Sequence, residues 1–401
     1  MEQKPTVELP KAPAGLITDA AELSELCADL RTAGAFGLDT EFIGETSYIP
    51  VLCLIQVSTA KRVALIDPQA PLDLAPLLEI IADPAVVKIC HAGQQDLEIL
   101  HHLGGRIPQN IFDTQIIAGQ LGVGYPLSYG KLVNYYCGVD LDKAHTYSDW
   151  SRRPLSPAQF EYAVDDVRYL PMIHACIARR LDETARWDWA KSACDELCLS
   201  ATAPVQPREL YRRIKTARSM QPVQLAVLRE LAAWREQLAF EHNMPARSLL
   251  PDNVIRDIAK LMPQHLRQFN QIKDFPRPEI KSYGPVILDM IESMRTLPES
   301  ACPRPDPEPL DSLESRVFGE SVWAAAQCVC LGQSVCTGVV TSQNHVLLLA
   351  DAVFTNSPLD QHLLMRGWRK QCLGGTLAEF ARGAKRLKLD FQNRRLQTEI
   401  S

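Results

Sequence analysis

The sequence predicts an α/β sheet domain followed by all-helical segments. Strand-like and helix-like segments alternate over the first 204 residues, which is typical of a sheet flanked by helices. From 210 to 297 only helical signals appear, separated by short turns as in a small bundle. A proline-rich and acidic run, PESACPRPDPEPLDSLES, then separates this bundle from a final apolar segment.

In the first part of the chain, hydrophobic periodicity defines each expected element. It predicts a helix at 19–33, strands at 35–42, 52–59 and 62–67, a helix at 72–83, a strand at 86–92, and helices at 94–104, 113–122, 128–137 and 156–181. Ser156 and Pro157 have the chemistry of a helix start. The run PVQPRE at 204–209 has the composition of a linker, so we expect the sheet domain to span 1–204.

The second half of the chain is expected to be helical. The predicted helices of its bundle are 210–219, 224–243, 253–263, 265–272 and 278–295. We therefore assign the bundle to 205–298 and the proline-rich linker to 299–315. The last domain, 316–401, is apolar, and helices are expected in it as far as residue 392.

Composition and charge narrow the class of protein. No uninterrupted apolar run reaches the roughly 18 residues that a membrane span needs, so we expect a cytoplasmic protein with no membrane contact. The 12 cysteines are scattered without a CxxC pair, which favours reduced thiols over zinc or disulfides. The net charge of −6 is uneven, because residues 1–204 carry −11 and residues 205–298 carry +5. Acidic clusters suit metal ions, and basic segments suit phosphate backbones.

The segment LDTEF places two carboxylates on one face of an expected strand. Side chains two residues apart on a strand point the same way, so Asp39 and Glu41 converge. On an exposed edge strand such a pair is unremarkable, whereas on an interior strand it favours a hard cation such as Mg²⁺ or Mn²⁺. Asp96 adds a further acid near the start of the helix after VVKICHAGQ, where α/β proteins commonly build their sites.

The segment EYAVDDVRYL supplies two adjacent aspartates, which helical phase distinguishes. At about 100° per residue the apolar side chains form one stripe, with Asp165 nearly opposite its centre and Asp166 at its border beside Tyr162. A solvated acidic face explains Asp165. A carboxylate at the rim of a core is costly to desolvate without compensation, so Asp166 is the candidate ligand. Four acids without a cysteine ligand or a phosphate-binding glycine loop indicate two-metal phosphodiester chemistry.

Three of these segments carry a resemblance to a known superfamily. LDTEF, CHAGQQDLEIL and YAVDD resemble, in order, the motifs of the DEDD 3′→5′ exonucleases, and the spacing of Tyr162 and Asp166 matches the DEDDy branch. ETSYIPVLCLIQVST, FDTQIIAGQLG and LDKAHTYSDWSRRPLSPAQFEYA are similar to the ribonuclease D family. The resemblance implies a ribonuclease H-like fold for the sheet domain.

The helical bundle resembles a second module. LRELAAWREQLAFEHNMPARSLLPDNVIRDIAKLMP and KSYGPVILDMI are similar to an HRDC domain, a helical module that binds nucleic acid. MRGWRKQCLGG gives a fainter match, from which we expect a degenerate HRDC-like domain at 316–401.

The resemblance also implies roles for the site residues. Asp39, Glu41 and Asp166 would hold one divalent ion, Asp39 would also touch a second, and Asp96 would support that second ion. Tyr162 would orient the attacking water, since a phenol with a pKa near 10 is a poor base. The ions would be two Mg²⁺ or Mn²⁺.

Each residue that could contact RNA also has a structural explanation. A histidine at a strand end is commonly just hydrogen-bonded, and the arginines in SDWSRRPLS adjoin a tightly packed helix start. Trp234 and Tyr283 occupy core-like positions and are expected to pack rather than to stack on bases. The candidates for RNA contact are His91, Gln95, Arg152, Arg153, Lys215, Arg218, Lys273 and Lys281.

Together these features predict a metal-dependent 3′→5′ exoribonuclease that releases nucleoside 5′-monophosphates. The resemblance adds RNA 3′ ends, above all those of tRNA precursors, as substrate, and we expect the protein to act as a monomer. Two alternatives remain open: a DNA 3′→5′ exonuclease of the same superfamily, and a non-catalytic RNA-binding scaffold. Loss of a metal ligand would have favoured the scaffold, but all four acids and the tyrosine are present.

Overall fold

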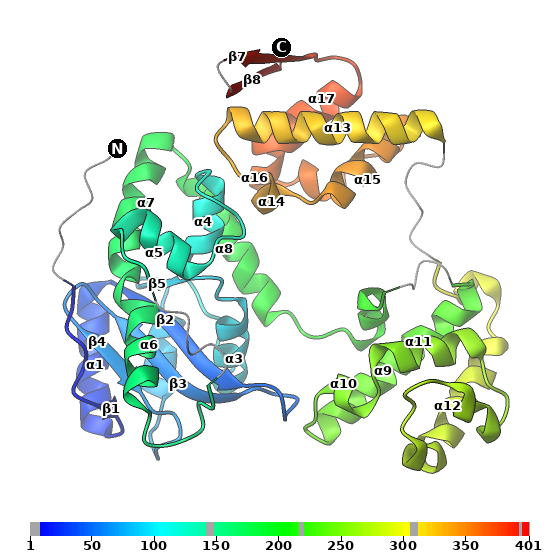
Figure 1. The fold of residues 1–401 in the computed structure, drawn as a ribbon, viewed down its shortest axis with the longest axis horizontal. Helices are drawn as coiled ribbons and strands as arrows, with labels where there is room; N and C mark the ends of the chain where they lie inside the picture. The colour runs from blue at the N-terminus through cyan, green and yellow to red at the C-terminus, as the bar shows by residue number, and fades with distance from the viewer. Residues whose placement is uncertain (1–8, 142–147, 216–219, 305–311, 393–394, 401) are drawn as a thin grey trace. The chain divides into compact units, whose positions relative to one another are not determined.

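The computed structural model describes residues 9–141, 148–215, 220–304, 312–392 and 395–400. The chain forms two compact units, whose elements are labelled in Figure 1. Unit 1 consists of Met1–Glu41, Leu52–Ala203 and Pro309–Ser401, and unit 2 consists of Phe42–Val51 and Pro204–Glu308. The predicted domains are consecutive stretches of the sequence. The compact units are not, because unit 1 combines the sheet with the C-terminal segment.

A six-stranded mixed sheet forms the centre of unit 1, in the order β1-β4-β3-β2-β5-β6. The strands are β1 (Leu16–Ile17), β2 (Ala35–Ile43), β3 (Val51–Ser58), β4 (Val63–Ile66), β5 (Val87–Cys90) and β6 (Ile111–Asp113). β5 lies parallel to both β2 and β6, whereas β3 and β4 are antiparallel. The four strands predicted from sequence are confirmed, and the short strands β1 and β6 were not expected.

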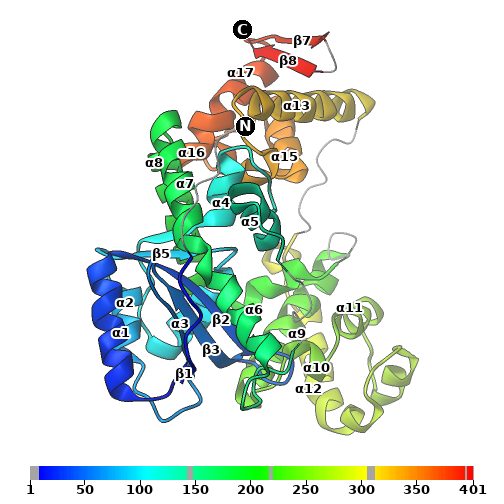
Figure 2. The same ribbon diagram turned by 60° about the vertical axis from the view of Figure 1, so that its left-hand side comes forward.

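Helices cover both faces of this sheet, as Figure 2 shows for α1 and α2 on one side and α6 on the other. The sheet face covered by α1 and α2 forms a hydrophobic core, in which leucines of both helices pack on the buried side chains of Phe36, Ile55 and Val57. The helices of this part are α1 (Ala20–Ala33), α2 (Ala75–Ile81), α3 (Gln94–Gly104), α4 (Thr114–Gln120), α5 (Tyr129–Cys137), α6 (Pro157–Arg168), α7 (Leu170–Thr184) and α8 (Trp187–Thr202). Helix α8 was not expected from sequence.

The prediction of a single helix at 156–181 is wrong, because the helix is interrupted between α6 and α7. Pro171 has no N–H, so the Val167 carbonyl cannot receive the hydrogen bond that a continuing helix would supply. Ser58 on β3 replaces that donor, with its Oγ 2.6 Å from the Val167 oxygen. Gly37 on β2 leaves room for this contact, since a Cβ there would lie 2.4 Å from Ser58 Oγ. The hydrogen bond between Ser58 and Val167 thus connects the end of α6 to β3.

The start of α6 follows the sequence signals closely. Ser156 Oγ accepts the Gln159 backbone N–H at 3.2 Å, and the Gln159 side chain accepts the Ser156 N–H at 3.0 Å. Pro157 occupies the first turn, where a missing N–H costs nothing. This capping box fixes where α6 begins and therefore which of its residues face the sheet.

The C-terminal segment is mostly helical, as predicted, but it ends in strands. Its elements are α13 (Leu313–Gly332), α14 (Thr337–Val340), α15 (Gln343–Phe354), η6 (Leu363–Met365), α16 (Gly367–Arg369), the π-helix η7 (Lys370–Gly374), α17 (Gly375–Ala381), β7 (Leu387–Gln392) and β8 (Arg395–Ile400). The expectation of helix as far as 392 is corrected by the antiparallel pair β7–β8. The sequence LKLDFQ alternates apolar and polar residues, which suits a strand better than a helix.

This segment shares a hydrophobic core with the sheet part of unit 1. Ala193 of α8 is buried in the same cluster as Val322, Leu349 and Leu377, and Trp189 packs against it. The Arg186 guanidinium joins the two parts, donating at 2.7 Å to the Gln120 carbonyl and at 2.5 Å to that of Gln333.

The helices of unit 2 enclose a separate core. They are η1 (Pro207–Arg213), α9 (Pro222–Glu241), α10 (Ala246–Leu249), α11 (Asp252–Leu261), η3 (Leu266–Gln271), η4 (Arg277–Glu279), α12 (Ile280–Arg295) and η5 (Glu299–Ala301). Buried Leu228 and Leu231 of α9 meet Ile255 of α11 and Ile287 of α12 in this core. Within the described residues of both units, no helix is long and apolar enough to cross a membrane.

Candidate active site

Three of the predicted carboxylates converge at the end of strand β2. Asp39 and Glu41 lie two residues apart on β2, and Asp166 approaches them from α6. One oxygen from each of these three side chains lies within 4.8 Å of the other two. Strand alternation and helix phase therefore placed these residues correctly, and the three are partly buried rather than spread over a solvated face.

Asp96 lies beside this group of three. It is in the first turn of α3, only 8% exposed, and its Oδ1 accepts a short hydrogen bond from the Thr40 hydroxyl. Because Thr40 stands between Asp39 and Glu41, this bond ties Asp96 to the same stretch of β2, and the Asp96 charge is close enough to contribute to the raised pKa values of both neighbours. The structure thus gathers all four acids around one stretch of three residues.

Asp113 fixes the start of α3, the helix that carries Asp96, although sequence reasoning did not single it out. This fully buried carboxylate caps α4 by accepting the N–H groups of Gln115 and Ile116 at 2.9 and 3.0 Å. Its other oxygen accepts the Gly93 N–H at 2.9 Å, immediately before α3 begins. At Gly93 a Cβ would lie 2.6 Å from Cys90 Sγ, so the close approach requires glycine. The signal available in the sequence was the position of Asp113 as a helix N-cap after a short apolar run.

The expectation that Asp165 is a solvated neighbour is wrong in part. Its side chain is 26% exposed and forms an ion pair with Arg168, whose Nε lies 3.1 Å from Asp165 Oδ1. The Asp165 backbone carbonyl also accepts a hydrogen bond of 3.3 Å from the Tyr129 hydroxyl. Asp165 therefore has a structural role on the flank of α6, and it does not join the three converging oxygens.

Burial and mutual repulsion make the acids of the site reluctant to ionise. Desolvation, followed by the charges of Asp166 and Asp96, raises the pKa of Glu41 from 4.5 to about 8. Desolvation, followed by Asp165 and Asp96, raises the pKa of Asp166 to about 8. The pKa of Asp39 is also raised well above its usual value, chiefly by burial. Burial also raises the pKa of Asp96, but only to about 6, because the Thr40 hydrogen bond favours the ionised form.

Two tyrosines flank the carboxylates. Tyr162 lies one turn before Asp166 on α6, is half-buried, and packs against the buried Trp150 with 6.0 Å between ring centroids. Tyr129 of α5 was missed by sequence reasoning, because no spacing relates it to the motifs. Burial and the nearby charges of Asp166 and Asp39 raise the pKa of the Tyr129 phenol well above 10. Its hydroxyl therefore stays protonated beside the acids.

Of the predicted RNA contacts near the site, some side chains are hydrogen-bonded within the protein and others are exposed. His91 belongs to the first group, because its two ring nitrogens lie 2.9 Å from Thr114 Oγ1 and 2.9 Å from the Leu127 carbonyl oxygen. Burial lowers its pKa, which favours the neutral ring. Gln95, by contrast, is exposed at the start of α3.

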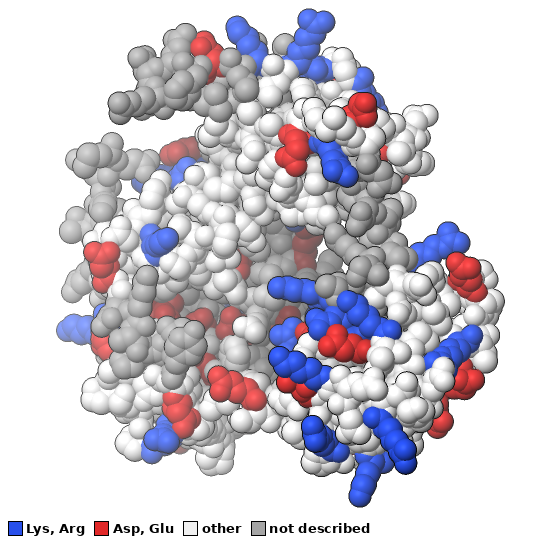
Figure 3. All heavy atoms as spheres, turned by 45° about the vertical axis from the view of Figure 1, so that its right-hand side comes forward, with Lys and Arg blue, Asp and Glu red and all other residues white. Residues whose placement is uncertain are grey.

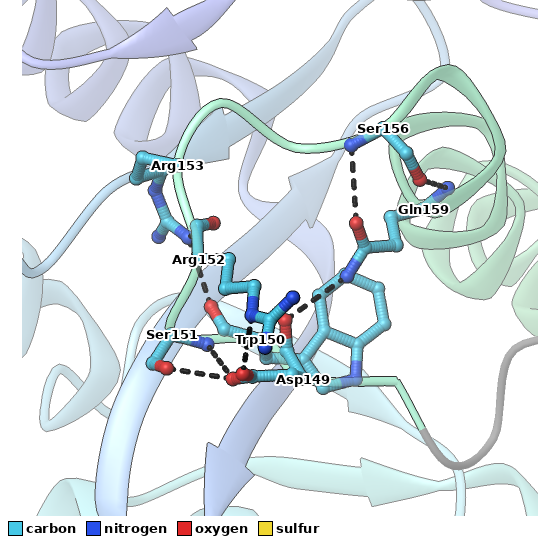
Figure 4. Close-up of polar contacts among 7 residues, drawn as sticks. All are labelled: Asp149, Trp150, Ser151, Arg152, Arg153, Ser156 and Gln159. Carbon is cyan, nitrogen blue, oxygen red and sulfur yellow. Dashed lines mark hydrogen bonds and ion pairs between the residues drawn. The ribbon is translucent and has the colours of Figure 1, made fainter.

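The neighbouring arginines differ in the same way (Figure 4). Arg153 donates two hydrogen bonds to the Asp67 carboxylate, at 2.6 and 2.8 Å, and others to the carbonyls of Cys53 and Trp150. Arg152 is 82% exposed and has an ion pair of 2.9 Å with Asp149. Arg153 therefore holds the segment before α6 in place, while Arg152 is accessible to a ligand.

The predicted contacts in unit 2 are exposed where they are described. Lys215, Lys273 and Lys281 are all exposed, and Arg218 lies outside the described residues. Figure 3 shows that many Lys and Arg side chains gather on the surface of this unit, at the lower right of the view. Trp234 and Tyr283 pack against the core and meet each other edge to face at 5.3 Å, as expected for packing residues.

The donor set fits a hard divalent ion. Carboxylate oxygens are the ligands that Mg²⁺ and Mn²⁺ prefer, and no sulfur donor belongs to the cluster of Asp39, Glu41 and Asp166. Three partly buried acids so close together repel one another when ionised, and a cation between them removes that cost.

Comparison with known proteins identifies the domains and the family of the chain. Residues 15–182 match the sequence family described as "3'-5' exonuclease", and residues 224–291 match the HRDC domain. A ribonuclease D of Pseudomonas paraeruginosa is 34% identical over 361 residues, covering 90% of this chain and 96% of that protein. A ribonuclease D of Gluconacetobacter diazotrophicus is 36% identical, with 94% of each chain covered.

Solved structures extend the agreement to the fold. The crystal structure of Escherichia coli RNase D, described as an exoribonuclease involved in structured RNA processing, superposes with a TM-score of 0.82 at 30% identity. The match covers 92% of this chain and 99% of that one. The fold and the matched domains define a 3′→5′ exonuclease of ribonuclease H-like architecture joined to a helical HRDC domain. The chain belongs to the ribonuclease D family, and it is a 3′→5′ exoribonuclease.

Proposed function

We propose that Asp39, Glu41, Asp96 and Asp166 bind two divalent metal ions and that this centre trims RNA from its 3′ end, with tRNA precursors as the main substrates. The observation that carries the proposal is the approach of three carboxylate oxygens to within 4.8 Å of one another. The raised pKa values of Glu41 and Asp166 reflect desolvation and mutual repulsion of the ionised groups, and a cation between them removes that cost.

Each residue of the site has a task in this reaction. Asp39, Glu41 and Asp166 would hold one ion, and Asp39 with Asp96 would hold the other. When bound, such ions activate a water and stabilise the leaving oxygen. The Tyr162 hydroxyl aligns the attacking water with the terminal phosphodiester. Asp113 keeps Asp96 in place through the Gly93 amide.

The substrate class follows from charge and from the family. The exposed lysines of unit 2 supply sequence-independent contacts to the phosphate backbone. The related E. coli enzyme is described as acting in structured RNA processing, which supports the choice of a folded RNA with a free 3′ end. We propose that the protein acts in this way as a monomer in the cytoplasm, with Mg²⁺ or Mn²⁺ as its ion.

A product analysis tests this proposal. The protein is incubated with a 5′-labelled tRNA precursor and with a DNA of matched sequence, in Mg²⁺, in Mn²⁺ and in EDTA. Stepwise shortening of the RNA with release of nucleoside 5′-monophosphates is expected in either metal. Asp39→Asn should be inactive, and Tyr162→Phe should be slower than the native enzyme. Activity in EDTA or in Asp39→Asn contradicts the metal centre, and faster cleavage of the DNA contradicts the substrate class.

A further inference from the structure

The segment that follows Glu41 is built into unit 2 rather than unit 1. Strand β2 carries Asp39 and Glu41 within unit 1, and the boundary falls between Glu41 and Phe42. The next ten residues, Phe42–Val51, belong to the compact unit formed by the HRDC helices, after which the chain returns to unit 1 at Leu52. Because β2 runs to Ile43 and β3 begins at Val51, this segment includes the ends of both strands and the loop between them, and it follows Glu41 directly.

Tyr48 provides the strongest contact in this segment. Its hydroxyl donates a hydrogen bond of 2.6 Å to Glu236 Oε1, a length typical of a charge-assisted bond. Its ring meets Phe240 edge to face, with 5.6 Å between centroids and an interplanar angle of 86°. Burial, followed by the bond to Glu236, raises the pKa of Tyr48, so the hydroxyl remains a donor.

Asn243 holds the backbone of the same segment. Its Oδ1 accepts the N–H groups of Tyr48 and Ile49 at 3.2 and 3.5 Å. The residue has a φ of 47°, a left-handed conformation that asparagine tolerates just beyond a helix end. The chain turn after α9 thereby presents an acceptor to two backbone amides.

The three receiving residues form one stripe on α9 and the turn after it. Glu236, Phe240 and Asn243 are spaced four and three residues apart, so they share one side of the helix. The core of unit 2 uses other positions, such as Leu228, Leu231 and Ala232. Phe240 remains 53% exposed even with Tyr48 against it, so the core does not need this stripe.

We propose that Tyr48 is a positioning residue of the exonuclease. By fastening Phe42–Val51 to α9, it restrains the outgoing end of β2 and holds the Glu41 carboxylate in the geometry that binds metal. The HRDC unit then contributes to the metal centre through the covalent chain as well as contacting RNA. This inference rests on the proposed role of Glu41 as a metal ligand.

The test uses three variants, Tyr48→Phe, Glu236→Gln and the double variant that combines these two changes. Each is compared with the control variant Glu241→Gln. Glu241 is on the same helix and takes the same chemical change, but its carboxylate contacts Gln237 instead. Hydrogen exchange is followed for the amides of Tyr48 and Ile49, and the affinity for Mg²⁺ is measured by calorimetry on the full chain without RNA. Single-turnover rates on a short single-stranded RNA at saturating Mg²⁺ complete the set.

Tyr48→Phe and Glu236→Gln should each speed exchange of the two amides about tenfold and weaken Mg²⁺ binding about threefold to tenfold. The double variant should be no worse than Tyr48→Phe alone, because both changes act on the same bond: Tyr48→Phe removes its donor, and Glu236→Gln keeps an acceptor oxygen but removes the charge that strengthens the bond. Glu241→Gln should behave like the native protein, and rates at saturating Mg²⁺ should change little. Faster exchange with unchanged Mg²⁺ affinity, or unchanged exchange, overturns the proposal. If Glu41→Gln also leaves Mg²⁺ affinity unchanged, the proposed metal centre fails instead.

Discussion

Replacing Glu41 by glutamine should stabilise the metal-free protein while removing its activity. Burial and the neighbouring carboxylates raise the pKa of Glu41 from 4.5 to about 8 in the folded protein. In the unfolded chain the same group has its ordinary pKa. Between these two pH values the folded protein retains a proton that the unfolded chain has released, so the free energy of unfolding falls as pH rises. The loss is complete above about pH 8, and none of it is present below about pH 4.

The size of the effect follows from the pKa difference. One such group changes the free energy of unfolding by about 1.4 kcal/mol per pH unit within this window. From pH 5 to pH 7 the cost of the native carboxyl therefore grows by roughly 2–3 kcal/mol. Glutamine cannot ionise, so Glu41→Gln should escape this cost. The gain at pH 7 should raise the Tm by about 4–10 °C.

Thermal unfolding in EDTA at several pH values measures this gain. Glu98→Gln is the matched control, because the Glu98 carboxylate is exposed and accepts a hydrogen bond from Gln94. The native protein and this control should lose stability together as pH rises, while Glu41→Gln should lose less. Saturating Mg²⁺ should reverse the order, since only the native site then gains binding energy. Parallel pH curves for the native protein and Glu41→Gln would refute the electrostatic description of the site.

Three further outcomes are expected. Asp166→Asn should slow single-turnover cleavage by orders of magnitude, whereas Asp165→Asn should cost mainly stability through its lost pair with Arg168; equal loss of rate in both contradicts the assigned ligand set. Arg153→Ala should lower the free energy of unfolding by about 2–4 kcal/mol, because the Asp67 carboxylate is left buried and unpaired; urea unfolding with the native slope and midpoint contradicts this. A chain ending at residue 304 should show a lower Tm and bind a dye for exposed apolar surface, because its half of the shared core is uncovered; native-like unfolding would show that the C-terminal helices are dispensable for the fold.

Periodicity was sufficient to predict which carboxylates converge at the candidate metal centre. Alternation along a strand put Asp39 and Glu41 on one face, and helical phase chose Asp166 over Asp165, because both depend only on local backbone geometry. Phase gave the direction of Asp165 correctly but not its surroundings. Arg168 and Tyr129 approach it from positions that no local pattern relates to it.

Long-range partners explain the other differences. The sequence shows that Pro171 disrupts a helix, but not that Ser58, more than a hundred residues earlier, supplies the missing hydrogen bond. Arg153 lies in a basic stretch that suggests phosphate binding, yet its partner Asp67 is far away in the chain and buried. Local patterns predict elements and faces, whereas these pairings depend on the tertiary fold.

The order in which the ribosome releases the chain matters for a unit assembled from Met1–Glu41, Leu52–Ala203 and Pro309–Ser401. Its apolar surface on α8 (Trp187–Thr202) stays uncovered until helices α13 to α17, which span Leu313–Ala381, have been synthesised. Unit 2 can bury its own core in that interval, because nearly all of its residues precede the last segment. The helical unit should therefore be complete first, and the sheet unit should close only near the end of translation. Until then the uncovered α8 surface is the part of the nascent protein most exposed to aggregation.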